Sequence, residues 1–153
     1  MKNLKLFILG LGVFCFACSA SAQVSRVKEP DMNKPKLFQN LPNDIAINAD
    51  QLSEILNHEV GQSVYINLSP GLQIQGQVVS TASKYENSIQ SIVIAVSNYN
   101  GARLTISRLT NKGMPTIYTG RIISFQHGDL FELASQNNQY YFIKKNFYDL
   151  VNE

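Results

Sequence analysis

The stretch that decides the fold is residues 64–78, VYINLSPGLQIQGQV. Apolar residues recur at every second position on both sides of the Ser69-Pro70-Gly71 segment. This period of two is typical of β-strands with one buried face, and Ser-Pro-Gly is typical of a turn. In the second half of the stretch the intervening residues are glutamines, which indicates a polar, solvent-facing side. Residues 64–78 therefore predict an antiparallel hairpin.

The same alternation continues to the C-terminal end of the chain. Turn sequences separate the apolar segments, and Asn100-Gly101 is the strongest of them because Asn-Gly favours positive φ. Further strands are expected at residues 89–97, 102–107, 116–125, 130–134 and 140–144. Together with the hairpin this makes a mainly β chain, an antiparallel meander of about seven strands. Since the edges of such a sheet must be hidden, we expect it to close as a small barrel or fold as a sandwich.

One short helix is predicted ahead of the strands. Asn48 or Asp50 can cap it, and an apolar stripe follows at helical spacing, formed by Leu52, Ile55 and Leu56. The helix is expected to end near His58, whose side chain would interact with the last carbonyls. Residues 23–43, interrupted by three prolines, predict an extended and poorly ordered arm. Residues 44–153 then form a single β-rich domain.

The first 22 residues have the pattern of an export signal. Lys2 and Lys5 precede an apolar run over residues 6–17, and Ala20-Ser21-Ala22 is an A-x-A cleavage site. The run is too short to span a bilayer, so a secreted or periplasmic protein without a membrane span is expected. The alternative is lipid anchoring through Cys18, although Cys15 stands where such signals usually carry leucine.

Cleavage after Ala22 would remove 22 of 153 residues and leave 131, enough for one domain with a core. Both cysteines, Cys15 and Cys18, would leave with the signal, which excludes disulfides, thiol catalysis and Cys-ligated metals. Loss of Lys2 and Lys5 leaves 11 basic residues against 11 acidic ones. A neutral chain with scattered charges lacks the basic stripe of nucleic-acid-binding proteins.

The sequence contains no motif of the common hydrolases, nucleotide-binding proteins or zinc enzymes. His127 and Asp129 could supply two metal ligands or part of a hydrolase site, but His-Gly-Asp is more typical of a plain turn. We expect neither a catalytic residue nor a metal, nor any cofactor, and interpret the chain as non-enzymatic.

A binding function is the best hypothesis that these residues support. Arg103, Arg108 and Arg121 fall on neighbouring predicted strands, and arginine suits carboxylate recognition. The alternative is that they form surface ion pairs with Asp129 and Glu132. Tyrosine, asparagine and glutamine are also frequent, as on adaptable recognition surfaces. The predicted partner-binding residues are Tyr118, Arg121, Tyr140 and Arg103, and the partner is an extracytoplasmic protein or cell surface.

A small-molecule carrier is the second hypothesis. A closed barrel of eight strands can hold one small ligand, and about seven strands are expected here. A cavity of several hundred Å³ lined by Ile94, Ile106 and Phe142 would favour this function, and a solid core would argue against it.

The C-terminal quarter resembles a known family. Tyr118-Thr119-Gly120-Arg121-Ile122, then residues 130–134 and Tyr140-Tyr141-Phe142-Ile143, resemble the β-rich propeptide module of secreted zinc metalloproteases. In that module a Y-x-G-x-I strand precedes two strands that end in an aromatic-aliphatic segment. Residues 1–153 contain neither a zinc-binding helix motif nor a protease domain. The resemblance implies a free-standing module that binds a secreted partner, and it assigns no functional residue.

Overall fold

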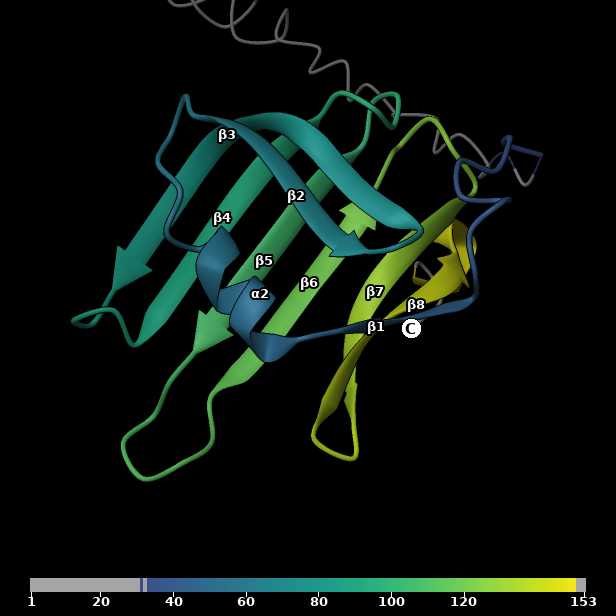
Figure 1. Ribbon diagram of the computed structural model, residues 1–153. Coiled ribbons are helices and arrows are strands. Elements are labelled where there is room, and N and C mark those ends of the chain that lie inside the picture. The colour runs from purple at the N-terminus through teal and green to yellow at the C-terminus, as the bar shows by residue number, and fades with distance from the viewer. Residues whose placement is uncertain (1–30, 32, 151–153) are drawn as a thin grey trace, which may run out of the picture.

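A computed structural model describes residue 31 and residues 33–150 of the protein (Figure 1). The predicted export signal and the start of the predicted arm lie outside the described residues. The elements are β1 (Asp44–Ile47), α2 (Ala49–Ile55), β2 (Ser63–Ser69), β3 (Leu72–Lys84), β4 (Ile89–Val96), β5 (Arg103–Leu109), β6 (Ile117–Ile123), β7 (Asp129–Gln136), β8 (Gln139–Asn146) and the 3-10 turn η1 (Phe147–Leu150).

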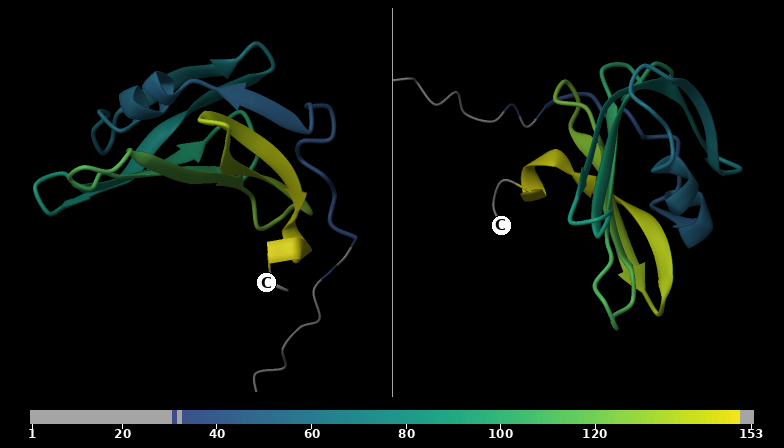
Figure 2. Two further views of the ribbon diagram at one scale, coloured as in Figure 1. Left: turned by 90° about the horizontal axis from the view of Figure 1, so that it is seen from below. Right: turned by 90° about the vertical axis from the view of Figure 1, so that its left-hand side faces the viewer.

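The eight strands form one antiparallel sheet in the order β1-β8-β7-β6-β5-β4-β3-β2. Strands β2 to β8 are the seven predicted ones, and they pair in sequence as the expected meander. The sheet curls into a half-barrel and stays open, as Figure 2 shows. The expectation of seven strands in a closed barrel or sandwich was therefore wrong in strand number and in closure.

Strand β1 is the element that the sequence analysis missed. It has four residues, and Ile45 and Ile47 are buried while Asp44 and Ala46 are exposed. It pairs with β8, from which it is far away in sequence, with Asp44 opposite Ile143 and Ile47 opposite Tyr140. Four residues are too few for a period of two to stand out, so the partner strand decides this conformation.

Helix α2 lies on the concave side of the sheet, in front of the central strands (Figure 1). Asn48 is its N-cap, as predicted, in a capping box with Gln51. Leu52 and Ile55 are buried in the core cluster beneath the helix. The imidazole Nδ1 of His58 lies 3.1 Å from the carbonyl oxygen of Ile55, which confirms its predicted place at the helix end. The helix thus covers the concave face that the open sheet leaves uncovered.

Part of the predicted arm belongs to the core. Phe38 is 1% exposed, and its ring packs against the rings of Tyr99 and Phe131. The carboxylate of Asp129, at the start of β7, accepts hydrogen bonds from the backbone N–H groups of Leu37 and Phe38 at 2.6 and 2.9 Å. The predicted arm is therefore attached to the sheet at Leu37 and Phe38. A buried carboxylate with two donors and a buried ring hold this segment in place.

Candidate binding groove on the outer face

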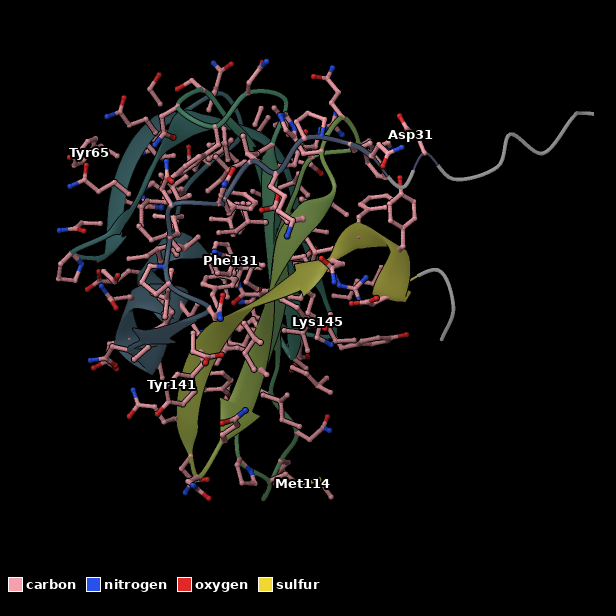
Figure 3. The ribbon with its side chains drawn as sticks, turned by 90° about the vertical axis from the view of Figure 1, so that its right-hand side faces the viewer. Asp31, Tyr65, Met114, Phe131, Tyr141 and Lys145 are labelled. Atoms are coloured by element: carbon pink, nitrogen blue, oxygen red, sulfur yellow. The ribbon has the colours of Figure 1, made fainter. Side chains whose placement is uncertain are left out.

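Strand β6 presents different residues on its two faces. Tyr118 and Ile122 point into the core, whereas Thr119 and Arg121 point outward and are exposed. The neighbouring strands also have two different faces: in Figure 3, Phe131 of β7 and Lys145 of β8 lie on opposite sides of the sheet. The four predicted binding residues therefore divide into two pairs: Arg103 and Arg121 lie on the outer face, while Tyr118 and Tyr140 lie on the inner face.

Tyr118 and Tyr140 are packing residues. Each is 9% exposed, and their rings meet edge to face with centroids 5.5 Å apart. The Tyr140 hydroxyl accepts a hydrogen bond from the Tyr118 backbone N–H at 3.1 Å and donates one to the Thr116 carbonyl at 3.4 Å. Both tyrosines were predicted as partner contacts, whereas the structure places them on the inner face of the curled sheet, enclosed by the rest of the core.

The hydroxyl of Tyr140 forms its two hydrogen bonds at the place where β6 and β7 separate. Strands β5 and β6 pair over seven residues, from Arg103–Ile123 to Leu109–Ile117. Strands β6 and β7 pair over only three, and the ladder ends at Arg121–Glu132. Beyond this point the Tyr118 N–H bonds to a side chain instead of a strand. We call this opening between β6 and β7 the split seam.

A groove of about 520 Å³ follows the split seam on the outer face. Its floor carries hydroxyl side chains from β5 and β6, and Phe125, which is 69% exposed, forms part of its rim. The lining residues are Thr105, Ser107, Thr119, Gly120, Arg121, Ile123, Phe125, Glu132 and Leu133. The groove therefore combines a strand edge, hydroxyl donors and acceptors, apolar surface and a charged end.

The charged end is a carboxylate shared by two cations. Arg121 donates two hydrogen bonds to Glu132 Oε1, from Nε at 3.0 Å and from an Nη at 2.8 Å. Lys145 Nζ lies 2.6 Å from the other oxygen, Oε2. The hydrogen bond from Lys145 lowers the pKa of Glu132, and Arg121 lowers it further, against desolvation, which raises it. The cluster carries one positive charge in excess of its single carboxylate.

The other two arginines lie at different places. Arg103 is exposed on the outer face and pairs in register with Ile123, so it is diagonal to Arg121 across the β5–β6 ladder. Arg108 is on the inner face, where it donates to Gln90 Oε1 and, at 3.4 Å, to the Ser53 hydroxyl of α2. The predicted alternative of surface ion pairs is confirmed for Arg121 with Glu132, while Asp129 binds the arm instead.

His127 and Asp129 have different hydrogen-bond partners. His127 Nδ1 lies 2.8 Å from the Ser124 hydroxyl, and Ser124 is fully buried. The Asp129 carboxylate is engaged by the N–H groups of Leu37 and Phe38. Within residues 31 and 33–150 no group of three or more His, Cys, Asp or Glu side chains is placed to hold a metal.

The interior of the half-barrel is packed. Ile94, Ile106 and Phe142, which would line the cavity of a carrier, are each 0% exposed and belong to one continuous apolar cluster. The hollow along the split seam is lined by other residues and opens on the outer face. The positions that a carrier would need for its ligand are thus filled by side chains that touch each other.

Sequence reasoning missed several residues of the groove: Thr105, Ser107, Thr119 and Phe125. The period of two does place Thr105, Ser107 and Arg103 on one face of β5, and this signal was available. The split seam itself has no local signal, because the residues that open it lie on three different strands.

The comparisons with known proteins found no relatives. No protein-family model matches the chain. No curated protein matches its sequence, and no solved structure matches its fold. Among the described residues, no helix is long and apolar enough to cross a membrane.

Proposed function

We propose that this protein is an exported, non-catalytic binding module that holds an extended segment of a protein partner in the groove along the split seam. The observation that carries this proposal is the early end of the β6–β7 ladder at Arg121–Glu132, directly beside a groove of about 520 Å³. A strand edge that lacks a neighbouring strand is a template for an added one, and a bound segment would here take over the Tyr118 N–H and the Thr116 carbonyl from the Tyr140 hydroxyl.

The groove also supplies side-chain contacts suited to a peptide. Hydroxyls of Thr105, Ser107 and Thr119 line it and can donate to or accept from an extended backbone. The excess positive charge of the cluster formed by Arg121, Glu132 and Lys145 favours an acidic side chain in the bound segment. Arg103, diagonal to Arg121 on the same face, adds to this preference.

The resemblance to propeptide modules supports the same function. Its three segments correspond to strands β6, β7 and β8, which are consecutive in the sheet, and β6 and β7 form the walls of the split seam. A free-standing module that binds a secreted partner is the function that the resemblance implies. Export through residues 1–22 is part of the proposal, and the N-terminal mass of protein purified from its host tests cleavage after Ala22 against a lipid on Cys18.

The groove is tested with a displayed library of random peptides selected on the immobilised chain. We expect the selected peptides to contain acidic residues and to shift the amide resonances of residues 118–120 and 133–135. Replacing Arg121→Gln should weaken binding about tenfold, the factor expected for one charge-assisted hydrogen bond of about 1.5 kcal/mol.

The matched control is Gln73→Ala, an exposed position on the outer face of β3 at the far end of the sheet. It should leave peptide binding unchanged. Peptides whose resonance shifts map to β2 and β3, or whose affinity is the same for wild type and Arg121→Gln, would contradict the proposal.

A further inference from the structure

The end of the sheet where the β3–β4 and β5–β6 hairpins turn carries exposed apolar side chains. Ile89, Leu109 and Ile117 lie opposite one another on β4, β5 and β6 and form one cross-strand row on the outer face. They are 38%, 37% and 51% exposed. Two turn residues extend the row, Tyr85 at 74% and Met114 at 67% exposure. We call these five residues the apolar tip.

The apolar tip protrudes from the body of the molecule. In Figure 1 the two hairpins extend past α2, and in Figure 3 Met114 lies at the far end of its turn. The β7–β8 turn, which lies on the same side of the molecule, carries the polar residues Asn137, Asn138 and Gln139 instead. The apolar side chains are thus confined to two neighbouring hairpins.

The backbone of the β3–β4 turn is held in a costly conformation. Tyr85, Glu86 and Asn87 all have positive φ, at 51°, 54° and 69°, a region that side chains other than asparagine rarely occupy. The Ser83 hydroxyl donates to Asn87 Oδ1, and the Ser88 hydroxyl donates to the Tyr85 carbonyl, both at 2.5 Å. These bonds fix a turn that projects Tyr85 into solvent. Packing in the core therefore does not account for an aromatic residue at this position.

Two lysines flank the apolar tip. Lys84 pairs in register with Ile89, and Lys112 lies in the β5–β6 turn two residues before Met114. Both lysines are exposed, and Glu86 is the acidic residue on the same two turns. Aliphatic groups, one tyrosine and flanking lysines on protruding turns form the composition of a membrane-water interface.

We propose that the apolar tip inserts shallowly into the headgroup region of a bilayer that contains anionic lipids. Met114, Ile117 and Tyr85 would enter the boundary between headgroups and acyl chains, while Lys84 and Lys112 contact the lipid phosphates. A lipid surface fits better than a protein partner because the exposed apolar groups stand on protruding turns that also carry Lys84 and Lys112, which can meet lipid phosphates. The apolar tip lies at the opposite end of β6 from the Arg121 cluster, and none of its five residues lines the peptide groove.

The test is co-sedimentation of the chain from Gln23 onward with two kinds of vesicle. One contains phosphatidylcholine alone, and the other contains equal parts of phosphatidylcholine and phosphatidylglycerol. We expect binding to the anionic vesicles that weakens as salt is added. Met114→Asp should abolish it, and Lys112→Gln should weaken it about fivefold, as expected for one charge near an anionic surface.

The matched control is Tyr65→Asp, which places the same charge at a 63% exposed aromatic position away from the tip. It should leave vesicle binding unchanged, and circular dichroism of each variant checks that the fold is retained. The proposal is overturned if neither vesicle binds the protein or if Met114→Asp binds as wild type does. It is also overturned if Met114→Asp abolishes a self-association of the free protein while vesicles have no effect, since the tip would then contact a second copy.

Discussion

The two sides of strand β6 differ in how they meet their neighbours. On one side β6 pairs with β5 over seven residues, and on the other it pairs with β7 over three. Gly120 explains the close side, because a Cβ there would lie 2.6 Å from the Thr105 carbonyl oxygen and 2.7 Å from Ile106 Cδ1. On the open side a tyrosine from β8 supplies the hydrogen bonds that a strand would supply. Strand β6 is thus paired along its whole length with β5, but only part of its other edge is paired with β7.

The largest expected effect concerns the close side. Gly120→Ala puts a methyl group against the backbone of β5. Strand β5 can move away from it only if the hydrogen bonds between β5 and β6 become longer. We expect the free energy of unfolding to fall by about 2–3 kcal/mol, as for overpacked sites. Urea denaturation measures this loss. Thr119→Ala, the exposed neighbour on the same strand, is the control and should change stability by less than about 0.5 kcal/mol.

The next effect concerns the hydroxyl that bridges the open side. Tyr140→Phe keeps the ring but leaves the Tyr118 N–H and the Thr116 carbonyl without this partner. The expected cost is about 1–3 kcal/mol, with faster hydrogen exchange at the Tyr118 amide. Tyr118→Phe, which keeps both backbone bonds, is the comparison and should cost less. An unchanged exchange rate in Tyr140→Phe would mean that water already satisfies the seam.

The smallest effect concerns the ion cluster at the point where the β6–β7 ladder ends. The lowered pKa of Glu132 means that its contribution to stability is present above the ordinary value of 4.5 and is lost as the pH falls through the lowered value. Glu132→Gln should therefore lose less than about 1 kcal/mol at neutral pH. Thermal unfolding over a pH series should show the difference between wild type and variant disappearing in acid. A difference that persists there would assign the effect to packing.

The sequence predicted most of the fold because its signals are local. The alternation in residues 64–78 and the Asn100-Gly101 turn, whose glycine has a φ of 67°, each act within a few residues. The openness of the sheet and strand β1 depend on contacts between distant segments, which one sequence does not display. Phe38 is held in the core in part by a hydrogen bond from its N–H to the Asp129 carboxylate. In the sequence, Asp129 appears only as the last residue of the turn His127-Gly128-Asp129.

The site was predicted in part, for a related reason. Arg121 was correctly placed near Glu132, because neighbouring strands of a meander bring such pairs together. Tyr118 and Tyr140 were assigned by residue type without regard to the face of the strand. The alternation of Tyr118 with Thr119 and Arg121 already indicated that the tyrosine and the arginine point in opposite directions.

The attachment of the segment before β1 to strands β7 and β8 has a consequence for how the protein is made. The bond from the Leu37 N–H to Asp129 spans 92 residues, and the bond from Lys144 to the Leu41 carbonyl spans 103. Neither bond can form until nearly the whole domain has left the ribosome. The nascent chain therefore lacks these long-range contacts during synthesis. For the export proposed above, this means that the chain can pass through a narrow translocation channel before its sheet is complete.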